Sequence, residues 1–372
     1  MTQDPLIETA LEQILSVWQI DAKDLRGRGP KGFDWLPGSH LVSVRAVPVD
    51  LKDQTYLMMQ GMGGANPREN GVQLSVTTRL IADFPFKSSR AVELVNVMAP
   101  WMTSTYSLVY PPQAFLEAFN APDGPCDLEL FSSVYIDPNL LGWLPNFFAQ
   151  MAIMQPIDAE LRGYRLPEML GGGQPAFEDG HKREELDAIL EVADQFLAPA
   201  GTQKSRWSGS DEFALFAQNF GQSEGCFANG GPTGLTAEVP FGSGSALIQC
   251  WTDQAHPQLG NGLLVTMMLP HNATDAPDGG VAGLNFIEAR GWTEVANLGC
   301  WHSRDAGRGR GIFPSHSTFV PNALYRPGLV QNFVLWEMGR ARWVRQTFFP
   351  EMQDRLMSEI LNDRLGGGAS IE

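Results

Sequence analysis

The stretch PNALYRPGLVQNFVLWEMGRARWVRQ at residues 321–346 has a near-copy earlier in the chain, PNLLGWLPNFFAQMAIMQPI at residues 138–157. Both copies begin with Pro-Asn-x-Leu and continue into an aromatic-rich segment that contains Asn-Phe, at 146–147 and 332–333. Each copy follows a run of strand character, SSVYID at 132–137 and HSTFV at 316–320. A repeat of this kind predicts two related structural units, each closed by a helix.

Working outward from the repeat, apolar spacing and turn residues predict the element order α-β-β-β-α-β-β-α in each half, with one extra strand possible in the second half. In the first half we expect helices at 5–20, 89–101 and 138–157, a loop at 24–32, and strands at 41–49, 56–62, 72–81, 105–110 and 128–136. In the second half we expect helices at 186–197, 281–295 and 322–357, and strands at 213–218, 234–239, 245–251, 262–269, 297–302 and 312–320. This order favours an α+β fold in which antiparallel sheets carry helices on one face.

A chain of 372 residues with 43% hydrophobic and 18% charged residues is long enough for two cores. We therefore expect a first domain at 1–169, a linker at 170–180 (LGGGQPAFEDG), a second domain at 181–362 and a flexible tail at 363–372. The two tandem units are expected to pack on each other as a pseudo-dimer.

The segments LELFSSVYIDPNLLGWLPNFFAQM (128–151) and GIFPSHSTFVPNALYRPGLVQNFVLWEM (311–338), together with the element order, resemble the type III secretion chaperone-like fold. The resemblance is to diverse bacterial proteins that share this fold without belonging to a secretion system. Secretion chaperones themselves are small, acidic homodimers of one such unit that bind unfolded effector segments. The resemblance implies a covalent version of that dimer, and it assigns no functional residue.

The formal net charge of −16 is spread over both halves and repels phosphate groups, so neither nucleic acid nor an anionic membrane is an expected partner. The charge-free stretch at 138–157 contains three prolines, two asparagines and two glutamines, and these favour a buried core helix over a membrane span. The N-terminal residues show no signal-peptide pattern, and the four cysteines have no disulfide-framework spacing. We therefore expect a cytoplasmic protein.

Motifs that carry chemistry are largely missing from the sequence: it contains no P-loop, HExxH, CxxC or GxSxG. No cofactor and no metal site are expected. The one compact constellation is CWHSRD at 300–305, where a strand would place Cys300 and His302 on the same face. These two residues are either a thiol nucleophile with its base or half of a zinc site, or they are simply core residues, which is the more common role.

Two further groups are candidate binding residues. Arg304, Arg308 and Arg310 lie in or beside the glycine-rich run GRGRG, where guanidinium groups and flexible backbone can hold a phosphate or a carboxylate. The loop at 24–32 has a similar composition, with Arg26, Arg28 and Lys31. The tryptophans of the repeated segments, Trp143 and Trp336, either form an aromatic groove for a partner or pack the two halves together.

From these features we predict a non-enzymatic protein-binding or scaffolding protein, chaperone-like for a protein or peptide segment. A purely structural or toxin-neutralising role has the same sequence features. The alternative is a thiol- or metal-dependent enzyme that uses Cys300 and His302.

Overall fold

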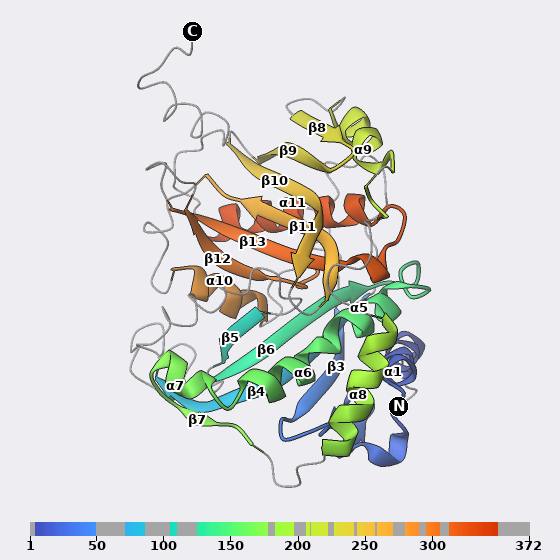
Figure 1. The fold of residues 1–372 in the computed structure, drawn as a ribbon, viewed down its shortest axis with the longest axis vertical. Helices are drawn as coiled ribbons and strands as arrows, with labels where there is room; N and C mark the ends of the chain where they lie inside the picture. Colours follow the sequence, from blue (N-terminus) through green and yellow to red (C-terminus); the bar gives the residue numbers. More distant parts are fainter. Residues whose placement is uncertain are drawn as a thin grey trace.

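Two antiparallel sheets with the same strand order form the framework of the chain (Figure 1). The computed structural model describes residues 4–49, 71–85, 105–109, 125–177, 183–196, 206–208, 210–221, 227–241, 244–256, 259–270, 280–289, 295–305 and 312–348. The strand predicted at 56–62 and the helix predicted at 89–101 lie outside these ranges. The helices and antiparallel sheets confirm the α+β class.

The first sheet has the order β1-β2-β3-β4-β6-β5, and β7 pairs with β4. Its strands are β1 (Gly27–Gly29), β2 (Gly32–Trp35), β3 (Val42–Val49), β4 (Gly71–Pro85), β5 (Thr105–Val109), β6 (Pro125–Ile136) and β7 (Gln174–Pro175). The second sheet, read from its opposite edge, has the order β8-β9-β10-β11-β13-β12. Its strands are β8 (Phe227–Gly231), β9 (Gly234–Phe241), β10 (Gly244–His256), β11 (Gly260–Met268), β12 (Cys300–Asp305) and β13 (Ile312–Pro321). In each sheet the first four strands in the chain form a meander. The fifth strand (β5 or β12) lies at the far edge of the sheet, and the sixth (β6 or β13) lies between it and the meander.

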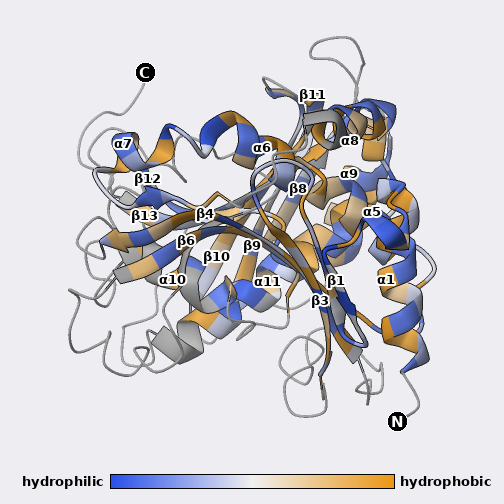
Figure 2. Cartoon of the chain, turned by 90° about the horizontal axis from the view of Figure 1, so that it is seen from below, coloured by the Kyte–Doolittle hydropathy of each residue, from blue (hydrophilic) through white to orange (hydrophobic). Residues whose placement is uncertain are grey.

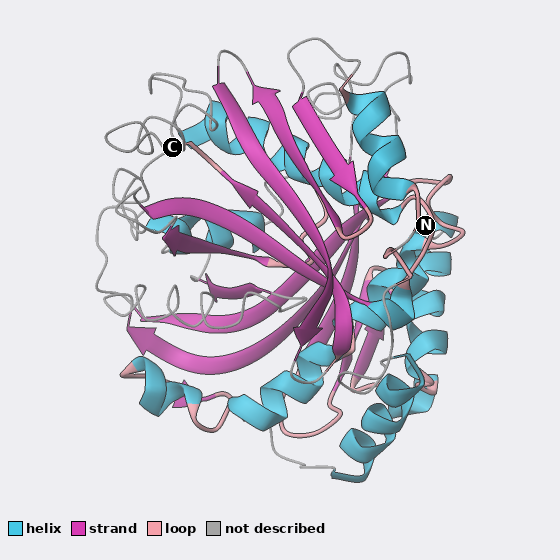
Figure 3. Ribbon diagram, turned by 45° about the horizontal axis from the view of Figure 1, so that its top comes forward, coloured by secondary structure: helices cyan, strands magenta, loops and turns pink. Residues whose placement is uncertain are grey.

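Most of the helices lie along the outside of the strands (Figure 3), whereas α10 (Gly280–Ala289) lies between the two sheets. The helices of the first half are α1 (Pro5–Trp18), the short 3-10 helix η1 (Ala22–Asp24), α5 (Leu144–Ala152), α6 (Met154–Arg162) and α7 (Leu166–Leu170). Those of the second half are α8 (Arg183–Phe196), α9 (Glu212–Phe220), α10 (Gly280–Ala289), η4 (Asn322–Leu324) and α11 (Leu329–Phe348).

Alternation of apolar and polar residues explains which face of the first sheet is covered (Figure 2). Along β4, Val72, Leu74 and Val76 are fully buried and lie on the side of α1 and α6. The amide of Gln155 on α6 fixes this packing: its Nε2 donates to the carbonyl of Val76 (3.1 Å) and to Ser132 Oγ (3.0 Å). The opposite face of the sheet is polar and carries ion pairs such as Arg79 with Asp127 (2.9 Å).

Several contacts join the two halves within the described residues, among them the packing of α8 on α6. A backbone bridge joins Ser133 of β6 to Asn297, with N–O distances of 2.9 and 2.8 Å. Helix α10 packs against both β12 and β5, which belong to different sheets. Phe147 of α5 and Phe333 of α11 meet edge to face. The apolar cores of the two halves are therefore continuous.

The expected elements need several corrections. Residues 213–218 are not a strand but part of α9, because Phe213, Phe216, Ala217 and Phe220 follow the helical period. The loop predicted at 24–32 contains β1 and the first residue of β2, which together form a hairpin that pairs with β3, and β8 was not anticipated. The predicted linker contains β7, so part of it belongs to the first sheet.

The helices that close the two halves begin later than the sequence predicts. In the first copy, Asp137 Oδ1 accepts hydrogen bonds from the backbone N–H groups of Asn139 (2.7 Å) and Leu140 (3.2 Å), and this turn delays α5 until Leu144. In the second copy, Pro327 and Gly328 separate η4 from α11, and Gly328 has a left-handed φ of 80°. The charge-free stretch at 138–157 does form mostly buried helices.

Candidate functional site

Strand β12 places Cys300, His302 and Arg304 on the face of the second sheet that points away from α11. The intervening Trp301 lies on the α11 face, where it contacts His316 with ring centroids 5.6 Å apart. The predicted alternation is therefore present. Arg308 and Arg310 lie outside the described residues.

The surroundings of Cys300 do not favour nucleophilic chemistry. Its side chain is fully buried, and burial raises the pKa of the thiol to about 12. Since the thiolate is the reactive form, a thiol with this pKa is inert near neutral pH. Among the described residues, no group of three His, Cys, Asp or Glu side chains is arranged to hold a metal ion.

His302 is paired with a serine. Its Nε2 and Ser317 Oγ form a 2.7 Å hydrogen bond between β12 and β13. Burial lowers the pKa of His302 to about 4, so the imidazole is neutral at neutral pH. Ser317 is itself only 1% exposed, which leaves no access for a substrate to this pair.

Arg304 lies at the half-buried end of the same face. Its guanidinium stacks over the ring of Trp251 on β10, 5.6 Å from the centroid, and Nη1 is 3.4 Å from Thr266 Oγ1. Burial lowers the pKa of Arg304. This cation is therefore engaged with its own sheet, and the structure does not bring it together with the two tryptophans predicted for binding.

Trp143 and Trp336 lie at the joint between the halves. Trp143 contacts Phe147 (6.0 Å between ring centroids), Phe147 contacts Phe333 (6.5 Å), and Phe333 contacts Trp336 (5.1 Å). Arg326 covers the outer ring of Trp143 at 4.9 Å. This four-ring ladder favours the interpretation in which the tryptophans pack the halves together over the interpretation in which they form a groove.

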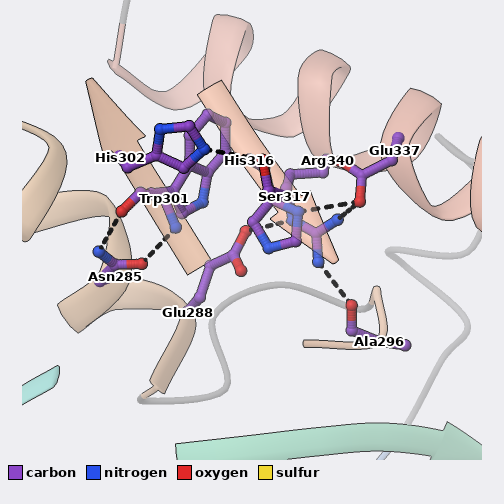
Figure 4. Close-up of polar contacts among 9 residues, drawn as sticks. All are labelled: Asn285, Glu288, Ala296, Trp301, His302, His316, Ser317, Glu337 and Arg340. Carbon is purple, nitrogen blue, oxygen red and sulfur yellow. Dashed lines mark hydrogen bonds and ion pairs between the residues drawn. The ribbon is translucent and has the colours of Figure 1, made fainter. Parts of the chain in front are cut away.

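A buried ionic network lies on the α11 face of the second sheet (Figure 4). Arg340 donates from Nε to Glu288 Oε1 (2.8 Å), from Nη1 to Glu337 Oε1 (2.6 Å) and from Nη2 to the carbonyl of Ala296 (2.5 Å). His316 Nδ1 lies 2.9 Å from the same Glu337 oxygen. The four side chains are at most 1% exposed.

Electrostatics within this network favour the charged forms. Burial alone would raise the pKa of Glu337, but the charge of Arg340 and the contact with His316 lower it. Burial alone would lower the pKa of Arg340, but Glu288 and Glu337 raise it. Because the network is sealed from solvent, its role is to hold α10, α11 and β13 together. The network also connects to the joint between the halves. Arg340 bonds the carbonyl of Ala296, and the next residue, Asn297, forms the backbone bridge to Ser133 of the first sheet.

Sequence reasoning missed this network, although a signal was present. Glu337 falls on the apolar stripe of α11 together with Val330, Phe333 and Val334, and a carboxylate in that position needs a buried partner. The partner at i+3 is Arg340. Asn285 on α10 completes the polar core by bonding both the backbone N–H (2.7 Å) and the carbonyl (2.8 Å) of Trp301.

Exposed apolar side chains gather on one segment of the first half. Of the eight large hydrophobic side chains exposed in the described part of the chain, four lie between 161 and 177: Leu161, Tyr164, Met169 and Phe177. We call them the apolar strip. The rings of Tyr164 and Phe177 are 4.6 Å apart. The ring of His40, which is 1% exposed, contacts the rings of both Phe177 and Tyr164.

Comparison of the chain with models of protein families, with curated proteins and with solved structures found no match. Within the described ranges, no helix combines the length and the apolarity needed to cross a membrane.

Proposed function

We propose that this chain is a non-enzymatic binding protein that captures an extended, partly apolar protein segment on the apolar strip. The observation that carries the proposal is that four of the eight large apolar side chains exposed in the described residues fall within residues 161–177: Leu161 is 60% exposed, Met169 is 63% exposed, and the rings of Tyr164 and Phe177 lie 4.6 Å apart. Clustered exposed apolar side chains mark interaction sites, whereas single ones are ordinary. Aromatic residues and methionine are also the types enriched at interfaces.

The proposed architecture is a covalent pseudo-dimer of two chaperone-like units. Three observations support it: the strand order is the same in both sheets, the Pro-Asn segments occupy the same place in each half, and the equivalent Phe147 and Phe333 contact each other. The chaperone-like relationship remains part of the proposal. Burial of Cys300 gives the thiol-enzyme alternative no support.

The proposal is tested by the ability of the chain to prevent aggregation of reduced insulin, followed by light scattering. The three described cysteines are buried and form no disulfide, so the reductant is compatible with the fold. We compare wild type with Leu161→Ser/Met169→Ser. The matched control is Leu215→Ser/Phe227→Ser, two side chains of similar exposure (54% and 60%) on α9 and β8.

We expect wild type and control to suppress aggregation, and the strip variant to lose at least half of that capacity. Circular dichroism and thermal unfolding establish that both variants are folded. No suppression by the wild-type chain, or an equal loss in both variants, overturns the proposal.

A further inference from the structure

A surface pocket of about 380 Å³ lies at the β1–β2 hairpin, lined by residues 27–34 and Arg45. The hairpin turns through Pro30 and Lys31, and Gly32 then pairs with Arg45 of β3. A Cβ at Gly32 would lie 2.1 Å from the carbonyl oxygen of Val44, so only glycine allows the hairpin to approach β3 this closely. The hairpin is thus fixed to the sheet.

The charge of this pocket is opposite to that of the molecule. Its lining includes three cations (Arg28, Lys31 and Arg45) and a single carboxylate, Asp34, in a chain with a net charge of −16. Arg45 is held by Asp34 (2.5 Å) and by the carbonyls of Phe33 and Val44. Arg28 contacts Glu12 of α1. Lys31 is exposed and forms no ion pair with any described residue.

The backbone beside the pocket is open. β1 is the outermost strand of the first sheet as described, and its three residues are all exposed. A Cβ at Gly29 would meet no atom within 4 Å, and one at Gly27 would meet only Asp34 Oδ2 at 3.9 Å. An exposed strand edge of this kind accepts an extended chain through backbone hydrogen bonds.

We propose that an acidic, extended protein segment pairs along β1 and places a carboxylate in this pocket against Lys31. The unpaired ammonium provides the charge and the free edge of β1 provides the backbone donors and acceptors. Arg28 and Arg45 keep their own partners and add a positive field. The site is separate from the apolar strip and does not depend on it.

The test is fluorescence anisotropy with fluorescein-labelled octaglutamate at low ionic strength, on the full chain. We expect Lys31→Glu to weaken binding by about fivefold or more, because it reverses the cation of the pocket that has no ion-pair partner among the described residues. The matched control is Lys23→Glu, which makes the same change of charge at an exposed lysine outside the pocket. We expect less than about a twofold effect there.

Two further probes separate the parts of the proposal. Octaglutamate N-methylated at alternate residues keeps the charge but cannot pair with a strand, and we expect it to bind more weakly. Inorganic phosphate is expected to compete poorly. No binding of octaglutamate, equal effects of the two lysine variants, equal binding of the N-methylated probe, or full displacement by dilute phosphate each overturns the proposal. The variant Leu161→Ser/Met169→Ser should bind octaglutamate as wild type does, so failure here is distinct from failure of the proposed function.

Discussion

Phe147 and Phe333 hold equivalent places in the two copies of the repeated segment, and they meet edge to face with ring centroids 6.5 Å apart. In a two-fold symmetric dimer, residues near the axis contact their own copies. The Phe147–Phe333 contact has this character within one chain. It is the relationship expected if the halves derive from a dimer of identical units.

We expect the two rings to be energetically coupled. Each is at most 4% exposed, so truncation to alanine should destabilise the chain by about 3–5 kcal/mol. Urea unfolding of Phe147→Ala, Phe333→Ala and the double variant should give a coupling free energy of about 0.5–1.5 kcal/mol. The control is Phe213→Ala, which truncates a buried ring on α9. Its effect on the free energy of unfolding should simply add to that of Phe147→Ala. Strict additivity of the Phe147 and Phe333 variants would contradict a shared joint.

Arg340 should be among the most sensitive positions in the core. Replacing it with methionine leaves Glu288 and Glu337 buried without their cation, which typically costs about 3–5 kcal/mol. Arg340→Lys should recover only part of this stability, because an ammonium cannot reach Glu288, Glu337 and the Ala296 carbonyl in the same geometry. Thermal and urea unfolding measure both variants. A methionine variant as stable as wild type would show that the network adds nothing.

His302 should make stability depend on pH. Its pKa is about 4 in the folded chain against 6.5 ordinarily, so the unfolded chain binds the proton more tightly. Stability should therefore fall as pH decreases from about 6.5 to about 4, by about 3 kcal/mol in total. His302→Gln should abolish this part of the pH dependence. Ser317→Ala keeps the imidazole, so it should lower stability but leave the pH dependence of stability in place. Identical pH profiles for wild type and His302→Gln would refute the assignment.

Asp158 on α6 should act in the opposite direction. Burial raises its pKa to about 6, although Arg162 partly offsets the effect. The folded chain therefore holds this proton more tightly, and stability should fall as pH rises from about 4 to about 6. Asp158→Asn should be more stable than wild type by about 3 kcal/mol at pH 8 and nearly equal to it near pH 3.5. Urea unfolding at the two pH values checks this, and no gain at pH 8 would contradict it.

The sequence predicted the features that depend on local periodicity and on the repeat. These are the α+β class, most of the long strands, the helices α1 and α8, and the buried character of residues 138–157. It failed on strands too short to show an alternating pattern. β1 has three residues and is defined by its pairing with the adjacent β2, whereas β7 has two residues and is defined by its pairing with β4, which lies far away in the chain.

The candidate sites were predicted only in part. Alternation along a strand correctly placed Cys300 and His302 on one face, but it could not show that both are buried. Glu337 is a local partner of Arg340 on α11, but Glu288 on α10 and the carbonyl of Ala296 before β12 reach Arg340 only through the tertiary fold. The apolar strip was missed because Leu161, Tyr164 and Met169 have the same residue types as a core helix face.

Cys300 gives the most direct test of the alternative enzymatic function. With its thiol fully buried and its pKa raised to about 12, iodoacetamide should label it far more slowly in the native chain than in urea. Peptide mapping by mass spectrometry follows each cysteine separately. Cys126 is the internal control, since it is 2% exposed and burial likewise raises its pKa to about 12. Both should be protected together and become reactive on the same unfolding transition. Rapid native labelling of Cys300 with Cys126 still protected would mean a reactive thiol, and would favour the thiol-dependent enzyme over the binding protein.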